Sequence, residues 1–173
     1  MGLLSVAVKF KTTDKGLKRM QKSANDLQGR KVNVGYLEGG EMAWLAAIHE
    51  YGCRIKVTPK MRAYLHSQGL HLKATTDEIV IPERSFLRAG WDNHKDEVIK
   101  KTDPLIADVL GGTMSADQFC QTVGLLLKSK IQDYAVDLRS PANHPFTIKR
   151  KGSSNPLVDS GDMVGAISYE VEK

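Results

Sequence analysis

The chain has 173 residues, of which 41% are hydrophobic and 26% are charged. This composition is typical of a globular protein, and no apolar run approaches the ~20 residues that a membrane-spanning helix requires. The net charge of +5 permits contact with nucleic acid or an acidic protein surface but demands neither. The apolar N-terminus lacks a basic start and a small-residue cleavage site, so we expect neither a signal peptide nor a membrane partner.

The cysteines and histidines limit which disulfides and metal sites the chain can form. Cys53 and Cys120 are the only cysteines, and they lie in unlike contexts, so we expect two reduced thiols and no disulfide. The histidines are scattered, and His49 lacks the second histidine four residues later that a zinc-protease helix needs. We therefore expect no metal and no cofactor.

The N-terminal part alternates between strand and helix patterns. Apolar residues at every second position predict a strand over 6–10 and another over 32–36. Helical spacing predicts a helix between them, over about 12–28, that ends at a glycine. A second helix is expected over 41–51, with Gly52 as its stop.

Residues 54–73 give weaker signals. Thr58 followed by Pro59 is typical of a helix start, so a short helix is expected there. The alternation over 70–73 predicts a strand, and Asp77-Glu78 is expected to be the hairpin turn that joins it to a strand over 79–81.

Residues 81–88 mark the point where strand periodicity changes to helix periodicity. Pro82 cannot donate a ladder hydrogen bond, so it should end the strand. Apolar residues at helical spacing from Leu87 onward predict a helix over about 85–101. We expect a structural corner between the sheet and the helical layer.

The C-terminal half is predicted to be mainly helical. Pro104 should either kink the long helix or begin a separate piece over 105–110. Ser115 and Gln118 form a capping box, followed by apolar residues at helical spacing for about six turns. A last strand over 167–171 should tie the C-terminus into the sheet.

Together these elements predict an α+β fold and a single domain over residues 1–173. We expect a small mixed or antiparallel sheet of about four to five strands, packed against two long helices. Residues 139–155 contain prolines, glycine and basic residues but no Asp or Glu, and they are predicted to form a long, exposed basic loop. Loops of this length are usually functional or mobile.

The corner carries the first group of candidate interface residues. Arg84 and Arg88 are four residues apart and can share a helix face, and Glu83 suits a helix start. Phe86 is expected either to fill the core or to anchor a neighbouring subunit, since aromatic and arginine side chains dominate interface energetics. The alternative is a set of solvated charges with local pairing.

The basic loop carries the second group, which consists of Phe146, Lys149, Arg150 and Lys151. Positive side chains can contact DNA phosphates without any sequence motif. The alternative is a solvated segment without a ligand.

No catalytic pattern is found in the chain. Ser160 lies outside a Gly-x-Ser-x-Gly motif, and the glycine after Lys151 does not belong to a phosphate-binding loop framework. An enzyme of another type, using Asp159 or Asp162, is the weakest of three hypotheses because no base, nucleophile or metal cluster accompanies them. We expect the protein not to be an enzyme.

Several local patterns occur in a fixed order: Ala47-Ile-His-Glu-Tyr-Gly52, Ile81-Pro-Glu-Arg-Ser-Phe-Leu-Arg88, the long helix from Ser115, Thr147-Ile-Lys-Arg-Lys-Gly-Ser-Ser154 and Pro156-Leu-Val-Asp-Ser-Gly-Asp162. Their succession resembles the neck, or tail-completion, proteins of long-tailed bacteriophages, which are also labelled virion morphogenesis or head–tail joining proteins. The resemblance covers most of residues 30–173.

The resemblance implies a structural virion protein that completes the tail top or the head–tail connector. It implies assembly in the host cytoplasm and a place in the neck or tail of the virion. The implied partners are copies of the chain in a ring, six- or twelve-fold, together with connector, tail-terminator or tail-tube proteins, and non-specific contact with DNA in the lumen. The alternative is a nucleic-acid-binding module that contacts DNA phosphates through its basic loop.

Overall fold

The computed structural model describes residues 15–173, so the strand predicted over 6–10 and the start of the first helix lie outside the described residues. The described part is α+β and 58% helical, with seven helices and four strands. The helices are α1 (Lys15–Leu27), α2 (Glu41–Tyr51), α3 (Pro59–Ser67), α4 (Phe86–Gly111), α5 (Ala116–Asp137), α6 (Pro145–Lys151) and α7 (Asp162–Gly165). The strands are β1 (Lys31–Gly35), β2 (Cys53–Lys56), β3 (Glu78–Ile81) and β4 (Ser168–Glu172).

The strands form two separate antiparallel pairs, so the expectation of one sheet of four to five strands is wrong. β1 pairs with β4, and β2 pairs with β3. Alternation along a strand reveals which of its faces is buried, but it carries no information about which strand lies beside it. The sequence patterns therefore identified strands without identifying their partners.

The two long helices predicted in the C-terminal half are present as α4 and α5, and they pack against each other as an antiparallel pair. Gly112 ends α4 in the left-handed conformation, and the predicted capping box of Ser115 and Gln118 starts α5. α4 continues through Pro104 as one helix of 26 residues. Val98 and Val109, on either side of the proline, are both buried, so packing on both sides offsets the backbone hydrogen bond that proline removes.

The β1–β4 sheet packs one face against α5. Val34 lies opposite Tyr169 and Val32 lies opposite Val171, so these four side chains share that face. Gly124 on α5 leaves room for the Tyr169 ring, which a β-carbon at that position would overlap. The final strand thus ties the C-terminus to β1, as predicted.

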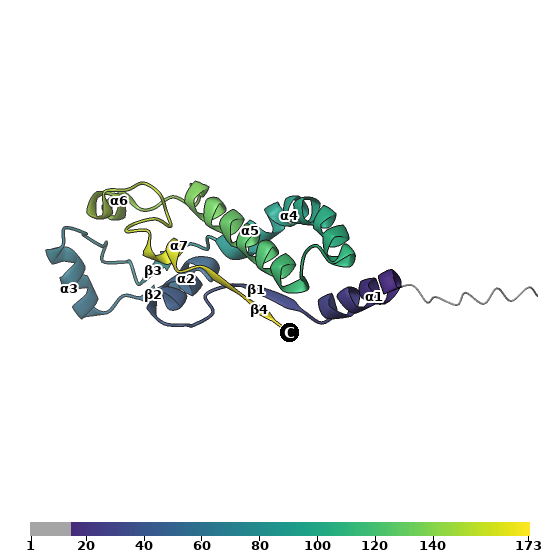
Figure 1. The fold of residues 1–173 in the computed structure, drawn as a ribbon. Coiled ribbons are helices and arrows are strands. Elements are labelled where there is room, and N and C mark those ends of the chain that lie inside the picture. The colour runs from purple at the N-terminus through teal and green to yellow at the C-terminus, as the bar shows by residue number, and fades with distance from the viewer. Residues whose placement is uncertain (1–14) are drawn as a thin grey trace, which may run out of the picture.

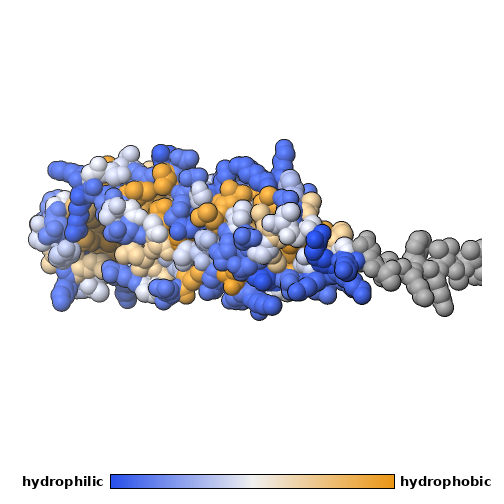
Figure 2. Space-filling model, in the orientation of Figure 1, coloured by the Kyte–Doolittle hydropathy of each residue, from blue (hydrophilic) through white to orange (hydrophobic). Residues whose placement is uncertain are grey.

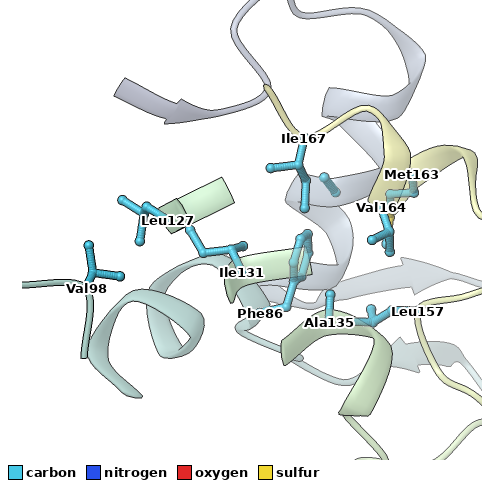
Figure 3. Close-up of a cluster of buried hydrophobic side chains, with 10 residues drawn as sticks. Phe86, Val98, Leu127, Ile131, Ala135, Leu157, Met163, Val164 and Ile167 are labelled. Carbon is cyan, nitrogen blue, oxygen red and sulfur yellow. The ribbon is translucent and has the colours of Figure 1, made fainter. Parts of the chain in front are cut away.

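The hydrophobic core lies between α5, the start of α4, α2 and the α7–β4 segment. Phe86 and Ile167 are fully buried, and Phe86 points into the cluster from the first turn of α4 (Figure 3). The buried members of the cluster are Ala46, Phe86, Val98, Leu127, Ile131, Ala135, Leu157, Met163, Val164 and Ile167. Of the two roles predicted for Phe86, the structure shows the core role.

The β2–β3 pair and α3 lie at one end of the elongated molecule, and α1 lies at the other (Figure 1). Thr58 caps α3 by accepting a hydrogen bond from the Met61 amide, and Pro59 occupies the first turn, as predicted. The strand expected over 70–73 is absent from the described chain, and Asp77-Glu78 is not a hairpin turn. The partner of β3 is β2, which precedes α3 and whose alternation of Cys53 and Ile55 with two charged residues was not recognised in the sequence.

The segment over 139–155 is not a loop throughout, because it contains α6. His144 caps this helix, Pro145 opens it and Gly152 ends it in the left-handed conformation. Proline at a helix start and glycine after its end are recognised boundary signals, which the loop-like composition obscured. None of the helices in residues 15–173 combines the length and the apolar character needed to cross a membrane.

Candidate interaction surface

Glu50 organises the corner between α2 and α4. Its carboxylate is 2% exposed and accepts hydrogen bonds from the backbone amides of Leu87 and Arg88 at 2.9 and 3.1 Å. The Ser85 hydroxyl and the Arg88 guanidinium also donate to it, each at 2.9 Å. A side chain from α2 therefore performs the capping that Ser85, the residue at the cap position, does not perform for α4.

Burial by itself would raise the pKa of Glu50. The hydrogen bonds from the Leu87 and Arg88 amides, the Arg88 guanidinium and the Ser85 hydroxyl outweigh it, so the pKa of the carboxyl lies below its ordinary value. Glu50 is thus a stably ionised group that fixes the start of α4.

Arg84 attaches the segment over 139–155 to the corner. It is 4% exposed, and its guanidinium donates to the carbonyl oxygens of Pro141 and Ala142 at 2.7 and 3.1 Å and to Asn143 Oδ1 at 3.1 Å. Its backbone amide donates to the carbonyl of His49 at 2.7 Å. This arginine holds the chain that leads into α6, and it is not available to an outside partner.

Glu83 and Arg88 lie on the outer side of the corner. Arg88 donates to Glu83 at 2.8 Å, and its guanidinium lies over the ring of Tyr51 at 4.8 Å from the ring centre. The four candidate residues of the corner therefore separate into two groups. Arg84 and Phe86 are buried, whereas Glu83 and Arg88 are exposed.

The basic residues of α6 also point in different directions. Lys149 and Arg150 are exposed, and neither forms an ion pair within residues 15–173. Lys151 is half-buried and donates to the carbonyl oxygen of Asn155 at 2.7 Å. Burial lowers the pKa of Lys151, against the attraction of Asp159.

His49 lies between the corner and α6. Burial, followed by the positive charges of Arg84 and Lys151, lowers the pKa of His49 to about 4. The imidazole is therefore neutral near pH 7, and its Nδ1 lies 3.4 Å from the guanidinium of Arg84.

An apolar groove opens beside Arg84, with a volume of about 520 Å³. Phe146 of α6 lines one wall, and Val80 and Pro82 line another. Figure 2 shows apolar side chains exposed in a hollow at the end of the molecule that carries α3 and α6. The structure thus brings Phe146 and Arg84 together at this groove, on a different side of the corner from Glu83 and Arg88.

α2 presents a second, aromatic surface. Trp44 and Tyr51 are both 66% exposed, and their spacing of seven residues places them on one helix face. Met42, Leu45 and His49 line a cavity toward α6 and α7. At 100° per residue, these two sets lie on opposite sides of α2.

Sequence patterns missed the most important residues of this region. Glu50 is assigned no role by the sequence patterns, because no local pattern indicates that its partners lie 35 to 38 residues later. Helical spacing did not reveal the exposed position of Trp44, because Trp44 and Ile48 are four residues apart and share one face of α2.

Residues 15–173 hold no group of three or more histidine, cysteine, aspartate or glutamate side chains arranged to bind a metal ion. Comparison with protein-family models, curated proteins and solved structures finds no match to this chain.

Proposed function

We propose that the protein is a structural subunit of the neck of a long-tailed phage. Copies of the chain form a ring that completes the tail top or the head–tail connector and docks to connector, tail-terminator or tail-tube proteins. In this role the protein works through surfaces and not through an enzymatic reaction.

The observation that carries this proposal is the presence of two unlike apolar surfaces, the aromatic face of α2 and the groove beside Arg84. A ring requires a heterologous interface, in which one patch of a subunit contacts a different patch of the next. The aromatic surface of Trp44 and Tyr51, with Arg88 over the Tyr51 ring, has the composition of an interface centre. The groove lined by Val80, Pro82 and Phe146 supplies a second apolar patch.

The hydrogen bonds that Glu50 and Arg84 form within the corner also support the proposal. Glu50 fixes the start of α4, and Arg84 fixes the chain before α6. Both surfaces are therefore held before assembly, which lowers the entropy lost on binding.

Deletion of the gene from a phage that carries it tests the function. The expected result is an accumulation of DNA-filled heads and separate tails, which electron microscopy distinguishes from joined virions. Complementation with the intact chain should restore joined particles. Normal joined virions from the deletion would exclude the proposed function.

Contact with DNA phosphates is a second candidate function, favoured by the exposed and unpaired Lys149 and Arg150. The purified protein should then bind duplex DNA with an affinity that falls steeply as salt rises. Reversing both charges to glutamate should weaken binding and reduce the salt slope. The matched reversal of Lys60 and Lys73, exposed on the α3 side, should not. Absence of binding at low salt removes this candidate.

A further inference from the structure

The outer edge of β4 is the feature on which this inference rests. A two-stranded sheet has two outer edges, and within residues 15–173 the backbone of β4 pairs only with β1. The unpaired amides and carbonyls of such an edge form a template for another strand. An added strand would extend the sheet across α5.

The polar face of β4 carries two carboxylates, Glu170 and Glu172. Both are exposed, and both accept hydrogen bonds from the Asn33 side chain, at 3.2 and 2.8 Å. Neither forms an ion pair with a residue in the described part of the chain. A strand with positive side chains on this face would complement them.

The opposite face of β4 is apolar. Tyr169 packs onto Gly124 of α5, and Val171 lies on the same face of the strand. Leu125, the neighbour of Gly124, is 59% exposed. A strand added beside β4 would continue the row of apolar side chains over α5.

We propose that residues 6–10 of a second copy of this chain add to the outer edge of β4. Val6, Val8 and Phe10 alternate with Ala7, Lys9 and Lys11. When the three apolar side chains face α5, the period of two places Lys9 on the face of Glu170 and Glu172, and Lys11 follows directly after the segment. The same segment thus offers positive charge to the polar face of β4 and apolar side chains to the face that packs on α5.

The position of α1 favours a second copy over the chain's own N-terminal segment. α1 has 13 residues and is therefore about 20 Å long. It continues from the start of β1 away from the sheet (Figure 1). Residues 11–14 span at most about 17 Å between residues 10 and 15, which is too short for Phe10 to return along its own α1, so the full segment 6–10 cannot lie beside β4 of the same copy.

This inference deepens the proposed ring assembly, on which it rests for its biological setting, by naming a contact between two subunits. The first test is a charge-reversal cycle on the full chain, with self-association measured by sedimentation velocity. Lys9→Glu and Glu170→Lys should each weaken self-association by about five-fold, and the double variant should restore it. Additive losses in the double variant, or a wild-type chain that stays monomeric, overturn the proposal.

A pair of matched serine variants tests the apolar side of the segment. Val8→Ser removes a side chain that would be buried against α5, so self-association should fall by about ten-fold. Ala7→Ser introduces the same residue on the opposite face and should have no effect. Equal effects of the two variants contradict the predicted orientation.

Mixed cross-linking identifies which chain supplies the strand. A Lys9→Cys chain mixed with a Glu170→Cys chain should give a dimer with a flexible bis-maleimide, beyond the level seen with chains that carry only Cys53 and Cys120. In a chain with both substitutions, an internal link at high dilution would assign the strand to the same copy and overturn the proposal. If this contact fails while the gene deletion still separates heads from tails, only the strand contact is excluded.

Discussion

At the scale of single residues, two buried charges connect segments that are distant in the sequence. Glu50 of α2 caps α4, and Arg84 holds the carbonyls before α6. All buried side-chain polar atoms of residues 15–173 have hydrogen-bond partners. Because an unpaired buried charge is costly, the loss of either partner should affect the whole corner.

Glu50→Gln should destabilise the protein by about 2–3 kcal/mol at pH 7. The NH2 group of glutamine would replace one carboxylate oxygen and would face the N–H and O–H groups that now donate to that oxygen. Chemical denaturation measures this loss. Glu83→Gln is the matched control, since its exposed carboxylate also contacts Arg88. The control should change the unfolding free energy by less than about 0.5 kcal/mol. Equal losses in both variants would contradict the capping role.

The lowered pKa of Glu50 sets the pH range of this contribution. The folded state binds the proton less readily than the unfolded chain, whose carboxyl has the ordinary pKa of 4.5. The stabilisation is therefore complete above that pH and is lost as the pH falls through the folded pKa. Unfolding curves of Glu50→Gln should lack this part of the acid dependence.

The stability of the protein should also depend on pH through His49, in a range above that of Glu50. Its pKa is about 4 in the folded protein and 6.5 ordinarily, so the unfolded chain binds more protons between these values. Stability should fall as the pH drops from 6.5 to 4, by about 2 kcal/mol once partial exposure is allowed for. In unfolding experiments, His49→Gln should remove this dependence of the unfolding free energy on pH. Glu50→Gln should retain it, and an unchanged slope in His49→Gln would refute the assignment.

At the scale of elements, two glycines allow close contacts with α5. Gly90 of α4 faces Ile131, and Gly124 faces the ring of Tyr169. These positions let α4 and β4 approach α5 more closely than a β-carbon would permit. Each glycine lowers the helix propensity of its segment, but it does so at a position where close packing leaves little room for a β-carbon.

Gly124→Ala should destabilise the protein by about 1–3 kcal/mol, because the new methyl group would overlap Tyr169 and displace β4. Alanine is otherwise favoured over glycine in a helix by about 1 kcal/mol. Gly111→Ala provides the control, since nothing lies near that position in α4. It should be neutral or stabilising in thermal unfolding. A stabilised Gly124→Ala would show that β4 does not need this contact.

At the scale of the whole molecule, the long α4–α5 pair separates an end with α1 from an end with α3, β2, β3 and α6 (Figure 1). The aromatic surface of Trp44 and Tyr51 lies on α2, and the apolar groove beside Arg84 is lined by residues of β3 and α6. The molecule therefore has the distinct surfaces that the proposed ring requires, without any change in its fold.

The double substitution Trp44→Ser with Tyr51→Ser should reduce self-association by at least about ten-fold, as expected for an aromatic interface centre. Folding stability should change by less than about 1 kcal/mol, because both side chains are mostly exposed. Sedimentation velocity and thermal unfolding measure the two effects. Tyr64→Ser, which alters an aromatic residue 53% exposed on α3, should leave association intact. Unimpaired assembly of the double variant would exclude this surface.

Local patterns determined most of the elements by themselves. The capping box at Ser115, the proline at Pro59 and the alternation of β1 and β4 each depend on residues within a few positions. Helix boundaries and strand faces follow from such short-range chemistry. The expected interface role of the exposed Glu83, Arg88, Lys149 and Arg150 stays a prediction.

Only the tertiary structure decided how those elements combine. It paired β3 with β2 across α3, split the sheet in two, carried α4 through Pro104 and placed Phe86 in the core. It also joined Glu50 to the start of α4, 35 or more residues away in the chain. These outcomes depend on burial and pairing between distant segments, and the free energy of such contacts is not encoded in the periodicity of either segment alone.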